Sequence, residues 1–230
     1  MRFVRFFAAV LTVMGLLGCA TVDKGAVQAA VEGKSVAIVA TMDSAVQLSW
    51  IGTTVFNNES STIERPQWGL ASLALKDAET ALNNGKRFKS VRTLELGVPT
   101  KEEVLKHPDV QMSDLILVIS PSVGGDFVAM NEVPLKGVGV RQRSALGLPP
   151  YSASYASLEA VLFEARTGKQ VALVSETSLK MVGDKVLGKA ALDKGAVLKP
   201  AMEPLVLDGV KDSVRGAINA LIQRMGLGTQ

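Results

Sequence analysis

The apolar run "LILVI" at positions 115–119 constrains the fold more than any other feature of this chain. It is continuous and flanked by polar residues, which predicts a buried strand. Two earlier segments, 35–42 and 46–56, are also rich in β-branched residues and favour extended structure. A helical stretch and the strand-like segment 88–96 come between them and the buried run. Strands that alternate with helices predict a layered α/β core.

Two amphipathic helices are predicted from apolar residues that recur at helical spacing. In the first, the apolar residues follow steps of four, three and four, and Gly85 is predicted to end the helix in a left-handed conformation. These residues are Ala71, Leu75, Ala78 and Leu82. The second is the closing helix, for which Asp208 is the predicted N-cap. Its apolar stripe consists of Val210, Val214, Ala217, Ile218, Leu221, Ile222 and Met225.

Shorter signals define the remaining elements. Thr100 and Glu103 form a capping box ahead of a short helix that stops at Pro108. The polar segment 57–61 is predicted to be an exposed crossing loop. In the second half, the turn 166–169 joins two strands in a hairpin whose glycine supplies a positive φ. We therefore predict a single mixed-sheet α/β domain with two main helices and a β-hairpin-rich second half.

The first nineteen residues are typical of a targeting signal. Arg2 and Arg5 precede an uncharged apolar run at 6–18, and Cys19, the only cysteine, follows it. The run is shorter than the roughly 20 residues that a membrane-spanning helix needs, so it fits a secretory signal peptide better than a permanent anchor. The alternative is a buried cysteine at the end of an uncleaved helix.

The residues around Cys19 resemble the lipobox of bacterial lipoproteins. Leu16 and Gly18 fit that pattern, whereas Leu17 departs from it because alanine or serine is commoner there. The resemblance implies that residues 1–18 are removed, that the sulfur of Cys19 receives a diacylglyceryl group, and that the new amino terminus is acylated. Two or three acyl chains make a durable membrane anchor.

The resemblance also implies a place for the protein. Residues 19–34 are small, polar and glycine-containing, which indicates a lipidated N-terminus and tether ahead of a periplasmic domain at 35–230. Ala20 and Thr21 follow the cysteine, and neither is the aspartate of an inner-membrane retention signal. We therefore expect a protein on the outer membrane that faces the periplasm.

Charge and residue counts exclude several kinds of site. The formal net charge is +3, and two of the basic residues leave with the signal, so the mature chain is close to neutral. We find no basic cluster in the sequence that would indicate nucleic-acid binding. One histidine and no second cysteine argue against a zinc site, and no EF-hand loop is present. The alternative is a Ca²⁺ or Mg²⁺ site made of oxygen ligands alone, whereas our prediction is no metal site. We expect no cofactor.

A catalytic reading depends on His107. Aspartates follow it, and a predicted strand ends at Ser120 and Ser122, so a serine hydrolase triad can be written. No G-x-S-x-G motif precedes either serine, and the alternative is a surface histidine at a helix C-terminus. The segment "SVGGD" at 122–126 could offer backbone N–H groups to an anion, or its glycines could only permit a turn.

Aromatic residues suggest binding instead. Five of them lie near two predicted loops, and aromatic anchors are favoured at interfaces. The alternative is ordinary core packing. The five are Trp50, Phe56, Trp68, Tyr151 and Tyr155.

The order of these elements resembles the periplasmic domain of CsgG-type lipoproteins, which include relatives of the curli secretion channel and lipoprotein activators of peptidoglycan synthases. The resemblance rests on the lipidated cysteine, the helix that ends in "ALNNGKRFKSV" and the hairpin "LFEARTGKQVALVS". It implies a non-enzymatic envelope protein that binds a partner in assembly or secretion and could form homo-oligomers. The alternatives are an oligomeric export component of CsgG type and a periplasmic hydrolase.

Overall fold

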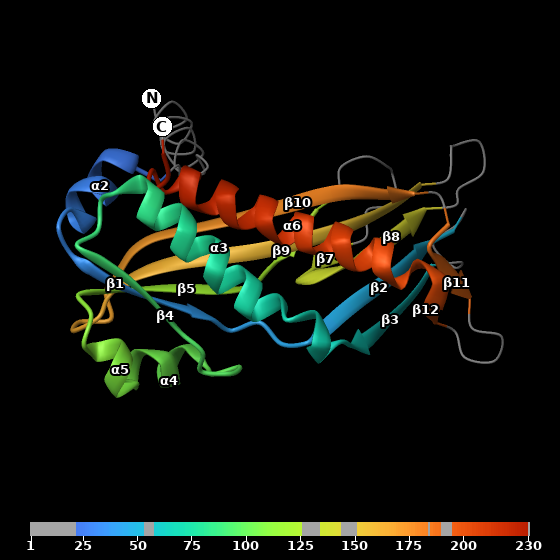
Figure 1. Cartoon of the computed structure of the whole chain (residues 1–230), viewed down its shortest axis with the longest axis horizontal. Coiled ribbons are helices and arrows are strands. Elements are labelled where there is room, and N and C mark those ends of the chain that lie inside the picture. The colour runs from blue at the N-terminus through green and yellow to red at the C-terminus, as the bar shows by residue number, and fades with distance from the viewer. Residues whose placement is uncertain are drawn as a thin grey trace, which may run out of the picture.

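A computed structural model describes residues 22–52, 58–125, 134–143, 151–183, 185–189 and 195–229. A large sheet carries two long helices, α3 and α6, side by side on one face, and two short helices, α4 and α5, at one end of the other (Figure 1). A further short helix, α2, lies near the carboxyl ends of α3 and α6. The helices are α2 (Lys24–Val31), α3 (Leu70–Gly85), α4 (Lys101–Lys106), α5 (Pro108–Gln111) and α6 (Glu203–Arg224), with 3-10 turns η2 (Pro66–Trp68) and η3 (Pro200–Met202).

The sheet is mixed, with the strand order β3-β2-β8-β9-β5-β1-β4, and β10 also pairs with β9. β1 is parallel to β4 and β5, and β2 is parallel to β8, whereas β9 is antiparallel to β5, β8 and β10. The strands are β1 (Ser35–Ala40), β2 (Ala45–Ile51), β3 (Glu59–Glu64), β4 (Ser90–Leu94), β5 (Leu115–Pro121), β8 (Val138–Arg143), β9 (Tyr151–Glu164) and β10 (Gln170–Gly183). Two small ribbons are β6 (Val123–Gly124) with β7 (Leu135–Lys136), and β11 (Leu187–Lys189) with β12 (Ala196–Leu198).

β9 joins the two halves of this sheet. Its residues 151–156 pair with β8, its residues 158–164 pair with β5, and β10 runs along almost its whole length. Three of its serines are fully buried, and each has a side-chain partner. Ser152 donates to Gln142 Oε1 at 3.3 Å, Ser154 contacts Ser213 of α6 at 3.1 Å between hydroxyl oxygens, and Ser157 contacts Thr177 of β10 at 3.0 Å. The hydrogen bonds offset the cost of burying these hydroxyls.

Strand alternation divides the core into two layers. In β1, Ile38 packs into a large cluster with α3 and α6, whereas its neighbour Val39 packs into a smaller cluster with α4 and α5. Successive side chains of a strand point to opposite faces, so one apolar strand supplies both layers. β5 does the same, which explains why its sequence is continuously apolar.

The predicted α/β class, mixed sheet and two main helices are confirmed. The apolar run is indeed a buried strand, β5. The capping box is present, because Thr100 Oγ1 accepts from the backbone N–H of Glu103 at 3.3 Å and the Glu103 carboxylate accepts from the N–H of Thr100 at 2.7 Å. The turn 166–169 closes the β9–β10 hairpin with Gly168 at φ +66°.

Three local expectations are wrong. The left-handed residue after α3 is Lys86 (φ 53°), and Gly85 stays helical. Gly85 is needed for packing instead, because a Cβ there would lie 2.1 Å from the carbonyl oxygen of Leu227. Asp208 lies inside α6, which begins at Glu203. Part of the segment 57–61 belongs to β3, which pairs with β2 although half of its residues face solvent.

The predicted tether contains a helix. Asp23 caps α2 by accepting from the N–H of Ala26 at 3.1 Å, and Val27 and Val31 are buried against the domain. Gln28 donates to the carbonyl of Gly226 at 2.8 Å, which fastens α2 to the end of α6. Residues 24–31 are therefore part of the folded body.

Candidate functional site

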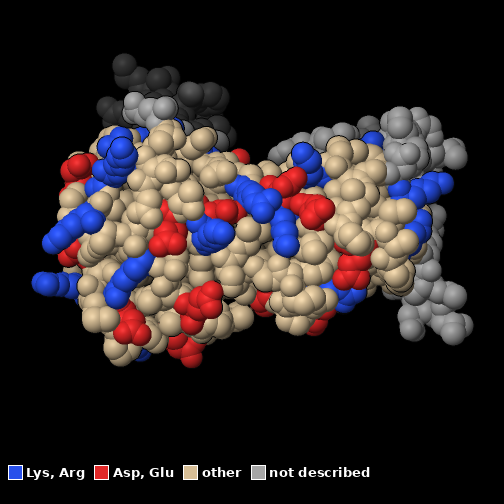
Figure 2. Space-filling view, viewed as in Figure 1, with Lys and Arg blue, Asp and Glu red and all other residues tan. Residues whose placement is uncertain are grey.

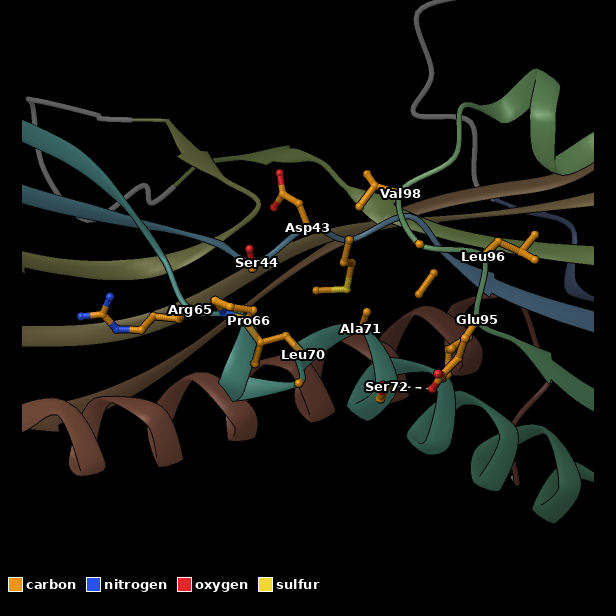
Figure 3. A pocket seen from close by; sticks show the side chains of 15 residues that line it. Asp43, Ser44, Arg65, Pro66, Leu70, Ala71, Ser72, Glu95, Leu96 and Val98 are labelled. Atoms are coloured by element: carbon orange, nitrogen blue, oxygen red, sulfur yellow. Dashed lines mark hydrogen bonds between the residues drawn. The ribbon is translucent and has the colours of Figure 1, made fainter.

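A cleft of about 370 Å³ opens where the carboxyl ends of β1 and β4 meet the amino end of α3 (Figure 3). In α/β sheets this is where ligands bind most often. Its apolar walls come from Met42 after β1, Leu70 and Leu75 of α3, and Leu96 and Val98 after β4. Val98 is 62% exposed, so a large apolar side chain stands at the opening.

The local sequence explains why the cleft is there. β1 ends before a polar turn that leads away to β2, and β4 ends before Gly97, which adopts φ +74°. α3 begins at Leu70 after Gly69, which is left-handed and offers no capping side chain. The amino end of a helix carries a partial positive charge, and here no acidic residue occupies the first turn.

An ion pair borders the cleft. Arg65 Nε lies 2.8 Å from the carboxylate of Glu203 at the start of α6, and Arg65 Nη1 donates to the carbonyl of Glu64 at 3.0 Å. Figure 3 shows the guanidinium pointing away from the centre of the cleft. Arg65 therefore ties the wall of the cleft to α6 and does not reach into the open space.

The remaining polar groups of the cleft are two carboxylates and two hydroxyls. Ser72 donates to Glu95 Oε1 at 3.0 Å across the cleft wall, and Ser44 donates to the carboxylate of Glu64. Asp43 accepts from the N–H of Ala45 at 3.1 Å. The described residues that line the cleft include no histidine, cysteine or lysine. This lining can hold an apolar group and can accept hydrogen bonds through its carboxylates. Its two hydroxyls, on Ser44 and Ser72, are each paired with a carboxylate.

The structure separates the aromatic residues that the sequence grouped. Trp68 is buried and Trp50 is half-buried, and both pack against the larger core cluster. Tyr155 is also buried, and its hydroxyl donates to the carbonyl of Lys136 at 3.4 Å; burial raises the pKa of its phenol far above the usual value.

Tyr151 is half-buried at the start of β9, with the guanidinium of Arg143 4.5 Å from its ring centre. Tyr155 lies on the opposite face of β9 from Ala156 and Leu158, which belong to the larger cluster with the tryptophans. The tyrosines and tryptophans thus do not form one surface. Core packing describes Trp68 and Tyr155, and Phe56 lies outside the described residues.

The triad written around His107 is not assembled. His107 stands between α4 and α5, and its Nδ1 lies 3.9 Å from Asp109 Oδ2. α5 is held to the start of β5, because Gln111 donates to the carbonyl of Ala165 at 2.9 Å. Ser120 and Ser122 lie at the other end of β5. Ser120 is roughly 17 Å from the start of β5, because a strand rises about 3.3 Å per residue.

The glycine-rich segment 122–126 serves packing in its described part. Gly124 lies in β6 against β10, and a Cβ there would be 2.0 Å from Thr177 Oγ1 and 2.7 Å from Ser157 Oγ. Ser122 donates its N–H to the carbonyl of Ser157 at 2.9 Å. The close approach of two strands therefore accounts for Gly124, and Asp126 lies outside the described residues.

The residues of the cleft had no local signal in the sequence. Asp43 and Glu95 are isolated carboxylates in chain order, and only the fold brings them to one cleft. The polar turns after the two predicted strands at 35–42 and 88–96 could have pointed to it, because adjacent parallel strands end at the same edge.

Other kinds of site are not found in the described ranges. No group of three or more potential metal ligands is present there. None of the described helices is long and apolar enough to cross a membrane. Cys19 precedes the first described residue, so its lipidation stays a prediction.

No protein-family model matches the chain, and no curated protein sequence matches it. Among solved structures, PelC from Paraburkholderia phytofirmans, a dodecamer, is 14% identical over 87% of this chain and 91% of its own, with a TM-score of 0.38. A protein from Xanthomonas campestris is 11% identical over 83% and 82%, with a TM-score of 0.40. A lipoprotein from Neisseria meningitidis is 10% identical over 80% and 99%, with a TM-score of 0.28. These similarities are distant and support no statement on function.

Proposed function

We propose that the protein is a lipid-anchored module of the bacterial envelope that binds a partner protein through the cleft between β1, β4 and α3. The observation that carries this is the lining of the cleft, which combines apolar walls with the carboxylates of Asp43 and Glu95. Such a lining favours an apolar side chain flanked by hydrogen-bond donors.

The anchor part of the proposal rests on Cys19 and the signal pattern ahead of it. We propose that the cysteine carries the lipid and that the domain faces the periplasm from the outer membrane, as expected from Ala20 and Thr21. Mass spectrometry of the mature amino terminus tests the first point. An unmodified cysteine, or a Cys19→Ala variant that stays with the membrane after signal removal, would contradict it.

The cleft is tested by placing a photo-crosslinking amino acid at Val98, which stands at the opening. Met112, which follows α5 and does not line the cleft, is 68% exposed and is the matched control position. We expect one envelope protein to be captured from position 98 and not from position 112. Ala71→Trp, which places a large ring in the cleft wall, should abolish the capture. Equal capture from both positions, or capture that survives Ala71→Trp, would refute partner binding at the cleft.

A further inference from the structure

Within the described part of the chain, β10 pairs with β9 on one edge and with no strand on the other. In β9, Ser157 donates its N–H to the carbonyl of Gly137 and accepts from the N–H of Ser122, so its backbone groups point away from β10. Because backbone direction alternates along a strand, the even-numbered residues of β9 bond to β10. The register pairs even with even residues from Ala172 to Met181.

It follows that five odd-numbered residues of β10 direct their N–H and C=O groups outward, away from β9. No described strand pairs with that edge. One of the outward carbonyls, that of Ser175, accepts from Arg224 at the end of α6 at 2.8 Å. The five residues are Leu173, Ser175, Thr177, Leu179 and Met181.

The side chains along this edge are unusual for a free strand. Leu173, Leu179 and Met181 are 42%, 43% and 61% exposed, and all three point to the face of β10 away from α6. Proteins normally protect a long edge with charges, proline or a covering element, because an open apolar edge pairs with other strands. β10 spans 14 residues and contains no proline, and its charged residues Glu176 and Lys180 lie on the α6 face, not among the exposed apolar side chains.

We propose that β10 pairs antiparallel with β10 of a second copy of this chain, about a two-fold axis at Ser178. Outward-pointing residues must oppose each other, so only every second register is allowed. Centring the pair on Ser178 places Glu176 of each copy opposite Lys180 of the other. Centring it on Glu176 or on Lys180 places like charges opposite each other, which is unfavourable. Centring it on Thr177 or on Leu179 is also allowed, but it places Glu176 and Lys180 opposite Ser178 or a valine and forms no pair of opposite charges.

A two-fold axis uses the same edge on both copies, so the pairing closes as a dimer. On the α6 face, each Glu176, which already contacts Arg224, gains a second cation. On the other face, Leu179 of one copy lies opposite Thr177 of the second copy, and Met181 of the first copy lies diagonally from that same Thr177. The exposed apolar side chains of both copies therefore share one surface. The proposal does not depend on the cleft, which lies beside β4 at the opposite edge of the sheet.

The first test measures the molar mass of the detergent-solubilised full chain by light scattering, which distinguishes a dimer from a monomer. Met181→Lys and Leu179→Lys add charge to the edge. Met112→Lys, at a similarly exposed methionine that follows α5, is the control. Because each changed side chain enters the interface twice, we expect dimer affinity to fall roughly tenfold or more in the edge variants and to be unchanged in the control. A monomeric wild-type protein, or edge variants that associate like the control, would overturn the proposal.

The second test reads the register. A Thr177→Cys protein is mixed with a differently tagged Leu179→Cys protein, both carrying Cys19→Ser, under mild oxidation. The proposed register places these two positions opposite each other, at about 5.5 Å between Cα atoms, which a disulfide can span. Heterodimers should therefore crosslink in preference to either homodimer. Crosslinking of Thr177→Cys with itself would instead require a different register and would refute the axis at Ser178.

Discussion

α6 lies close to the sheet at Gly209, and this contact gives the sharpest stability prediction. A Cβ on Gly209 would lie 2.2 Å from Val182 Cγ1 and 2.8 Å from Ser154 Oγ. Carbon atoms in favourable contact are about 3.5–4.0 Å apart, so Val182 or the helix would have to move by more than 1 Å. Val182 is buried and β-branched, and such a side chain has few alternative rotamers.

The magnitude follows from two opposing terms. Alanine in a helix is favoured over glycine by about 1 kcal/mol. Overpacking a core contact costs about 1–3 kcal/mol, and the short distance to a stiff buried side chain places this site near the upper end. We therefore expect Gly209→Ala to lower the free energy of unfolding by about 2 kcal/mol, although the substitution improves helix propensity.

Urea denaturation followed by far-UV circular dichroism measures the effect. The control is Gly25→Ala in α2, an exposed helical glycine whose added Cβ would meet only Asp23 Oδ1 at 3.4 Å. We expect this control to be neutral or slightly stabilising. If Gly209→Ala is as stable as wild type with an unchanged m-value, then α6 can accommodate a Cβ against β9 and β10. That result would refute the predicted overpacking.

Three further substitutions test the electrostatics. Burial raises the pKa of Asp77 above its ordinary value of 3.8, so the protonated carboxyl stabilises the fold at low pH and this stabilisation is lost as pH rises through the folded pKa. Asp77→Asn should therefore be more stable than wild type only above that pH, as measured by urea titration. The N–H and hydroxyl of Ser35 lower the pKa of Asp114, so Ser35→Ala should raise that pKa in an NMR titration. Arg65→Ala should lower the free energy of unfolding by about 1 kcal/mol, because it leaves Glu203 without its partly buried partner.

Elements determined by near neighbours were predictable from the sequence. The capping box at Thr100 and the hairpin turn at Gly168 depend on residues within four positions, and both occur as expected. The amphipathic stripe of α3 likewise follows from local spacing. β5 was recognisable because burial on both faces leaves no polar position in the run.

Elements determined by distant contacts were not predictable in the same way. The sequence predicts Gly85 as a helix stop. In the structure, its lack of a side chain allows the backbone of Leu227 to pack against it. β3 is polar and gains its structure from pairing with β2, so its composition resembles a loop. The cleft has the same origin, because Arg65 and Glu203 are 138 positions apart and meet only in the folded chain. The prediction that the aromatic residues form a contact patch has a related difficulty, because large rings suit both cores and interfaces and the sequence does not distinguish them.

The attachment of α2 has a consequence for when the domain can form. Gln28 bonds to Gly226 across 198 positions, and the start and the end of the described chain lie at the same end of the molecule (Figure 1). The space-filling view shows this face as a continuous surface on which basic and acidic side chains are interspersed (Figure 2). Part of the surface that holds α2 is formed only at the end of the described chain, while the rest includes β10. In a chain that emerges amino end first into a new compartment, the contact between Gln28 and Gly226 forms only after nearly all of the chain has crossed.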